Sequence, residues 1–102
     1  MKESCRVYLD EQFGGDADLV GEIYNEYVSS VVAKIGEAES ALASQDWTRL
    51  DRTAHTIKGN ALAAGDQEIA DTAISLRKSA ALSDVALSSS LIEKIKELSK
   101  VL

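Results

Sequence analysis

The absence of proline from all 102 residues limits what this chain can fold into more than any other feature. Proline breaks the interior of a helix, so a chain without it can form long helices anywhere along its length. The apolar residues also recur at intervals of three and four, which is the spacing of one face of a helix. Together the two features predict an all-helical fold.

Short polar interruptions divide this periodic pattern into four long segments. Asp16 is a candidate cap for the first segment, which ends at the interruption 44–46, where Asp46 can cap the second. Gly65 is a typical C-terminal stop for the second segment, and Asp66 can cap the third. Residues 83–84 mark the turn before the fourth. The β-branched cluster at 29–32 weakens the first segment, which allows a bend or a break there.

Helices joined by short connections pack as antiparallel neighbours, so residues 16–102 are expected to form an antiparallel four-helix bundle. Residues 1–15 are an N-terminal segment, in which residues 3–13 could add a short extra helix. The length predicts a single domain over residues 1–102. A stand-alone protein is expected because the chain starts with Met1 and shows no linker, although a fragment of a larger hybrid sensor kinase also fits. The protein is expected to be a monomer.

The composition excludes several classes of partner and location. The formal net charge is -6, whereas binding to nucleic acid needs a basic face that neutralises phosphates. No apolar run is long enough to span a bilayer, and the N-terminus has no apolar core of a secretory signal, so a cytoplasmic location is expected. The single cysteine, Cys5, cannot form an internal disulfide, which agrees with a reducing compartment.

The sequence AHTIKGNALAAG, residues 54–65, contains the only histidine of the chain. With 3.6 residues per turn, the apolar residues of this helix point about 120° or more away from His55. We therefore expect His55 on the solvent side of the bundle. On the same helical projection Gly59 lies about 40° from His55, Lys58 about 60° to its other side, and Leu62 almost directly in line with it.

The combination of His55, Lys58 and Gly59 suits the transfer of a phosphoryl group. An imidazole titrates close to neutral pH, so its neutral, nucleophilic form is well populated. Lysine supplies a point charge suited to phosphate oxygens. A mid-helix glycine costs roughly 1 kcal/mol relative to alanine, and here it removes a side chain that would crowd the imidazole.

Each of these residues alone has an ordinary structural explanation. A single exposed histidine usually has no function, a lysine is a common solvated charge, and Gly59 could mark a tight helix contact. The segment 45–60 is mildly basic, with Arg49, Arg52 and Lys58 against two acidic residues, which supports a site only weakly. The hypothesis of a site therefore depends on the three residues together.

The stretch AHTIKGNALAAG, followed by IADTAISL, resembles the histidine-containing phosphotransfer (HPt) family. The matching positions are Ala54, His55, Ile57 in place of leucine, Lys58, Gly59 and Gly65, and in the next helix Ile69, Ala70, Ala73 and Leu76. The chain departs from the family's pattern at Asn60, where serine or alanine is usual, and at Arg77, where an acidic residue is common. Neither departure is expected to touch the phosphate chemistry directly, although Arg77 could alter the choice of partner.

The resemblance implies a phosphorelay carrier without a kinase domain of its own, and a four-helix bundle with the histidine exposed midway along its second helix. His55 would accept a phosphoryl group from the phospho-aspartate of a receiver domain and pass it to another receiver's aspartate. Lys58 would steady the phosphoryl oxygens, and Gly59 would admit the receiver. The partners would be response-regulator receiver domains, a hybrid sensor histidine kinase, or both.

The resemblance also implies that the carrier has no cofactor, because Mg²⁺ would come from the receiver's acidic pocket. Candidate docking residues are Leu62, from its place in line with His55, and Arg52. Residues 7–13 are further candidates.

Other functional classes fit the sequence less well. Cys5 and His55 are each single, whereas transition-metal sites usually need three or four ligands, so no metal site is expected. No serine or cysteine pairs with a histidine in a hydrolase motif, and no glycine-rich phosphate loop indicates a kinase. One alternative stays open, namely a non-catalytic helical module that docks receiver domains or other signalling proteins.

Overall fold

The computed structural model describes all residues 1–102 as five helices without a strand, which confirms the all-helical fold. The helices are α1 (Glu3–Gln12), α2 (Ala17–Ala43), α3 (Trp47–Ala63), α4 (Gln67–Ala81) and α5 (Val85–Ser99).

An aspartate directly precedes each of the four longer helices and caps its N-terminus. The carboxylates of Asp16, Asp46, Asp66 and Asp84 each accept a hydrogen bond from the backbone amide three residues later. Such a cap satisfies one of the amides that the first turn of a helix leaves without a partner. The caps predicted at positions 16, 46 and 66 are therefore confirmed, and Asp84 has the same role after the predicted turn.

The three turns between α2 and α5 share one backbone pattern. Gln45, Gly65 and Ser83 each have a positive φ, of 52°, 75° and 51°. In every turn the aspartate that follows donates its amide to a carbonyl five residues earlier, which closes the preceding helix. The same aspartate caps the next helix, so consecutive helices are joined by short connections and lie side by side.

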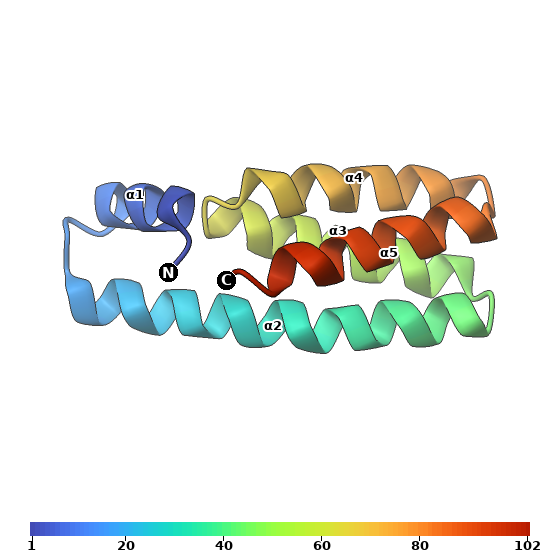
Figure 1. Cartoon of the computed structure of the whole chain (residues 1–102), viewed down its shortest axis with the longest axis horizontal. Coiled ribbons are helices and arrows are strands. Elements are labelled where there is room, and N and C mark those ends of the chain that lie inside the picture. The colour runs from blue at the N-terminus through green and yellow to red at the C-terminus, as the bar shows by residue number, and fades with distance from the viewer.

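Helices α2 to α5 pack as one helical bundle, and α2 runs along its whole length (Figure 1). Helix α3 packs on α2 and α4, and α5 packs on α4 and α2, which closes the bundle. The molecule is elongated, with extents of 42 × 20 × 18 Å. The short helix α1 lies beside the first part of α2, at the end of the bundle where α3 turns into α4 (Figure 1). None of the helices combines the length and apolarity that crossing a membrane requires.

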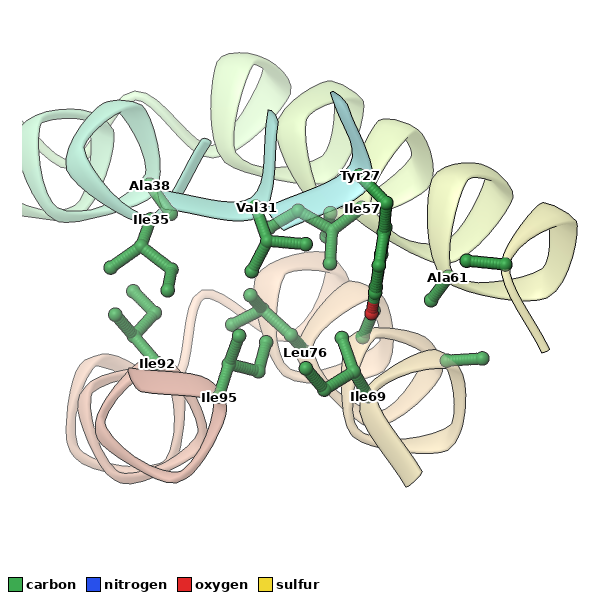
Figure 2. Close-up of a cluster of buried hydrophobic side chains, with 14 of the residues drawn as sticks. Tyr27, Val31, Ile35, Ala38, Ile57, Ala61, Ile69, Leu76, Ile92 and Ile95 are labelled. Carbon is green, nitrogen blue, oxygen red and sulfur yellow. The ribbon is translucent and has the colours of Figure 1, made fainter. Parts of the chain in front are cut away.

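The core is built by side chains from all four long helices. Val31 and Ile35 of α2, Ile57 of α3, Leu76 of α4 and Ile95 of α5 point into the same interior space (Figure 2). Val31 belongs to the β-branched cluster that could have interrupted α2, yet it is 1% exposed and the helix continues through it. Burial of such a side chain contributes about 1.5–3 kcal/mol, which exceeds a helix-propensity cost below about 1 kcal/mol.

A buried carboxylate attaches the N-terminal segment to the bundle. Asp66 has no exposed surface, and its carboxylate accepts hydrogen bonds from the Tyr27 hydroxyl at 2.7 Å and from the Lys2 ammonium at 2.7 Å. Burial, together with the bond to Asp66, raises the pKa of Tyr27 well above its ordinary value. Partial burial lowers the pKa of Lys2, but the hydrogen bonds and charges of Asp66 and Glu68 outweigh it and raise that pKa overall. Tyr27 therefore stays neutral and Lys2 stays charged, as this network requires.

The same junction accepts only glycine at position 65. Gly65 has the left-handed φ of 75°, and a Cβ added there would overlap the side chain of Tyr8 in α1. Helix α1 thus lies directly on the turn between α3 and α4.

Candidate functional site

His55 lies near the middle of α3, on the side of that helix that faces solvent. Its neighbours Ala54 and Ile57 are 0% and 1% exposed and form the opposite, core-facing side together with Leu50 and Ala61. The structure therefore confirms the exposed position that helical periodicity predicted for the imidazole. The helix is rigidly placed, because α2 and α4 pack on it from both sides.

The imidazole makes one side-chain contact, and it comes from the neighbouring helix α4. The Arg77 Nη1 atom lies 3.1 Å from His55 Nδ1, and the Arg77 Nε atom donates to Asp51 Oδ1 at 2.9 Å. Asp51 precedes His55 by one turn of α3, so the guanidinium bridges two positions on the same face. This contact leaves Nε2 as the ring nitrogen that is free of a protein hydrogen bond.

Arg77, which was expected not to touch the phosphate chemistry directly, contacts the histidine ring itself. Sequence reasoning missed this contact because it joins residues 22 positions apart. It depends on how α4 is rotated and shifted against α3, which periodicity within one helix does not report. The only available signal was a cation at a position where the family commonly has an acidic residue.

Lys58 is partly buried one turn after His55 and forms no ion pair with any carboxylate. It lines an open hollow between α3 and α4, which we call the α3–α4 hollow. The hollow is lined by Asp51, Lys58, Ile74, Arg77, Lys78 and Ala81. Three of these six side chains are cationic and one is anionic, so the hollow beside His55 favours an anion.

Gly59 lies on the exposed side of α3, and a Cβ added there would meet no other atom within 4 Å. Tight helix packing therefore does not explain this glycine. A special backbone conformation does not explain it either, because Gly59 lies inside the regular helix and has no positive φ. The open space above the backbone at this position is available to another molecule.

Asn60, the other departure from the family's pattern, connects α3 to α2. Its Nδ2 atom donates to Ser30 Oγ at 2.7 Å across the two helices. It also lines a groove between α2 and α3, together with Ile23, Glu26, Tyr27, Ser30, Ala63 and Ala64. Asn60 therefore points away from Arg77, towards the other neighbouring helix.

Both candidate docking residues are exposed on α3. Arg52 forms no ion pair, and 44% of Leu62 is exposed. Val7 and Phe13, in the N-terminal segment, are 42% and 39% exposed. Leu62 lies near the end of α3 that leads into the turn beneath α1, so apolar surface is present on both elements at this end of the molecule.

No group of three or more histidine, cysteine, aspartate or glutamate side chains is arranged to hold a metal ion. Cys5 lies in α1 and is buried, and burial raises the pKa of its thiol. The thiol is therefore a packed core group and not a reactive one.

Comparison with known proteins gives one match. A family model described as Hpt domain matches residues 22–102, which include the whole of α3 and α4 and every side chain of the site described above. No curated protein and no solved structure matches the chain.

Proposed function

Since the chain belongs to the Hpt domain family, we propose that it is a phosphoryl carrier of a two-component phosphorelay that uses His55. Members of this family perform histidine phosphotransfer in phosphorelays, and they act as carriers and not as kinases. The observation that supports the assignment to His55 most strongly is its position. It is the only histidine of the chain, and it is exposed in the middle of a helix whose opposite side is completely buried.

The proposed transfer runs through the Nε2 atom, the ring nitrogen that has no hydrogen bond within the protein. The Nε2 lone pair attacks the phosphorus of a receiver's phospho-aspartate, the P–O bond to the aspartate breaks, and its electron pair returns to the aspartate carboxylate. In the second transfer an aspartate of another receiver attacks, the P–N bond breaks, and its electron pair returns to Nε2. Lys58, which has no carboxylate partner, supplies positive charge to the phosphoryl oxygens.

The remaining parts of the proposal concern the partners and the domain. The partners are response-regulator receiver domains or a hybrid sensor histidine kinase, and the receiver's acidic pocket brings the Mg²⁺. Arg52 and Leu62 contribute to docking. Helices α2 to α5 are a four-helix bundle with α1 as an accessory helix, and residues 1–102 act as one monomeric Hpt domain in the cytoplasm.

A relay assay tests this function. The protein is incubated with a receiver that carries a ³²P-labelled phospho-aspartate, and then with a second, unlabelled receiver. We expect label on the protein that is lost in acid and retained in base, as a phosphoramidate is, and that moves on to the second receiver. Label that resists acid contradicts a phosphohistidine. No label with any receiver of the host contradicts the carrier, and favours the non-catalytic docking module instead.

Lys58→Ala is expected to slow the transfer from the receiver about tenfold. The estimate corresponds to the loss of one charge-assisted hydrogen bond, worth about 1.5 kcal/mol. Because Lys58 makes no ion pair in the free protein, its removal should change the free energy of unfolding by no more than about 0.5 kcal/mol. Lys94→Ala, on the exposed surface of α5, is the control for a general loss of positive charge. Equal transfer rates in the two variants would refute the role of Lys58.

Gly59→Gln is expected to stabilise the protein and to block its partner. Glutamine is a good helix former and meets no other atom at this position, so the free energy of unfolding should rise by about 0.5–1 kcal/mol. The added side chain stands beside His55, so transfer from a receiver should fall at least about tenfold, the cost of a clash of about 1.4 kcal/mol. Phosphoramidate, a small phosphoryl donor, should still label the variant.

The matched control for this experiment is Gly36→Gln. Gly36 is also exposed, lies in the middle of α2 and has no atom near its added Cβ. It should show the same gain in stability with unchanged transfer. If both variants transfer at the rate of the unmodified protein, Gly59 does not serve to admit the receiver.

A further inference from the structure

The contact between Arg77 and His55 determines which ring nitrogen carries the proton. A guanidinium can donate hydrogen bonds but cannot accept one, and it is not deprotonated in proteins. The contact from Arg77 Nη1 to His55 Nδ1 at 3.1 Å therefore requires a lone pair on Nδ1. In the neutral ring the proton is then on Nε2, the nitrogen that faces solvent.

We propose that Arg77 is a positioning residue that holds His55 in its non-nucleophilic tautomer, as a latch that a carboxylate of the docked partner opens. The inference rests on the proposed carrier function and adds a form of regulation to the same site. It explains why an arginine contacts a ring whose reacting nitrogen is the other one.

His55 accepts a phosphoryl group only in the fraction of molecules in which the latch is open. Attack on phosphorus requires the lone pair of Nε2, but that nitrogen carries the ring proton as long as Nδ1 accepts from Arg77. When Arg77 is drawn away, the proton can move to Nδ1, and Nε2 becomes the nucleophile. The new P–N bond then forms as the P–O bond of the donor breaks.

The closed latch also protects the phosphorylated state. When the P–N bond breaks, its electron pair returns to Nε2, and the ring leaves as neutral imidazole only if Nδ1 has gained a proton. Arg77 occupies Nδ1 with a donor that does not give up its proton, so the ring would have to leave as an anion. Loss of the phosphoryl group is therefore slower as long as Arg77 stays on the ring.

The surroundings of Arg77 allow a carboxylate to open the latch. The Arg77 side chain is 36% exposed, and its guanidinium already binds one carboxylate, that of Asp51. It lines the α3–α4 hollow with Lys58 and Lys78, so an acidic side chain that enters the hollow meets three cations. A bidentate arginine–carboxylate pair is stronger than the single hydrogen bond to a neutral ring nitrogen. The incoming carboxylate therefore replaces His55 as the hydrogen-bond partner of Arg77.

The tautomer can be measured without any phosphorylation, by long-range ¹H–¹⁵N correlation spectra of the His55 ring at a pH where it is neutral. We expect predominantly the Nε2–H tautomer in the unmodified protein, a mixture of both tautomers in Arg77→Ala, and mainly Nδ1–H in Arg77→Glu, whose carboxylate can accept from Nδ1. Lys94→Ala, the control on the exposed surface of α5, should keep the unmodified pattern. A substantial Nδ1–H population in the unmodified protein, or an unchanged pattern in Arg77→Ala, overturns the proposal.

The rates are measured with phosphoramidate as the donor, so that no receiver is involved. Loss of one hydrogen bond changes a rate about fivefold. Arg77→Ala should therefore accept the phosphoryl group about fivefold faster than the unmodified protein, and its phosphohistidine should be hydrolysed about fivefold faster. Slower acceptance in Arg77→Ala overturns the latch and makes Arg77 a phosphate-binding cation. Failure of the unmodified protein to take label from any donor contradicts the carrier function, whereas the tautomer populations still decide the role of Arg77.

Discussion

His55→Gln is expected to take up no phosphoryl group from a receiver or from phosphoramidate. Glutamine matches histidine in approximate size and polarity, but its amide nitrogen has no available lone pair and cannot form the P–N bond. Since His55 is exposed and outside the core, the substitution should change the free energy of unfolding by no more than about 0.5 kcal/mol. The effect is therefore a complete loss of transfer in a protein of unchanged fold.

The measurement is the ³²P label on the variant beside the unmodified protein, with circular dichroism and urea unfolding to show that both are folded. The chain has no second histidine, so acid-labile label has no other histidine on which to form. Label on His55→Gln that is acid-labile would show that another nucleophile carries the phosphoryl group. A variant that is unlabelled because it is unfolded would be recognised by its circular dichroism.

Asp66→Ala is expected to lower the free energy of unfolding by about 3 kcal/mol, since removal of one partner from a buried ion pair costs about 3–5 kcal/mol. The carboxylate has no exposed surface and accepts hydrogen bonds from Lys2, Tyr27 and the Ile69 amide in the first turn of α4. The variant leaves the buried Tyr27 hydroxyl without a partner. The low end of the range applies because Lys2 still contacts Glu68 at 3.0 Å.

Urea unfolding of a graded pair of variants checks this prediction. Asp66→Asn keeps one acceptor oxygen, which can serve either the helix cap or Tyr27, since these two bonds use different oxygens of the carboxylate. It loses the charge that pairs with Lys2, but it should cost less than Asp66→Ala, which loses every acceptor. In a Tyr27→Phe background the cost of Asp66→Ala should shrink by about 1 kcal/mol, because the unpaired hydroxyl is already gone. A value for Asp66→Ala within about 0.5 kcal/mol of the unmodified protein would show that this network does not hold the N-terminal segment.

The elements and their ends could be predicted from the sequence because each is decided by local physics. The spacing of apolar residues identifies a helical face, and the aspartates at 16, 46 and 66 cap helices wherever those helices pack. The exposure of His55 followed from the same argument, since its angle to Ala54 and Ile57 is a property of a single helix. The same argument could not decide whether Gly59 marks a tight helix contact or leaves space for a partner. Only the surrounding structure shows that a Cβ added at this position would meet no other atom.

Long-range polar contacts needed the tertiary structure. Asp66 was predicted as a helix cap, and it is one, but its bonds to Lys2 and Tyr27 span 64 and 39 residues. Arg77 was expected to influence only the choice of partner, and it contacts the histidine ring. A polar contact between two helices depends on their relative rotation and shift, which the packing of the whole apolar core determines.

The sequence by itself thus determined the helices, their caps, the exposed histidine and the resemblance to a phosphotransfer family, since all of these are carried by neighbouring residues. Only the tertiary structure decided which charged groups reach one another across α3 and α4, and so which nitrogen of His55 is free. The reason is that side-chain direction within one helix follows from its 3.6-residue period, whereas the register between helices follows from packing of all of them at once.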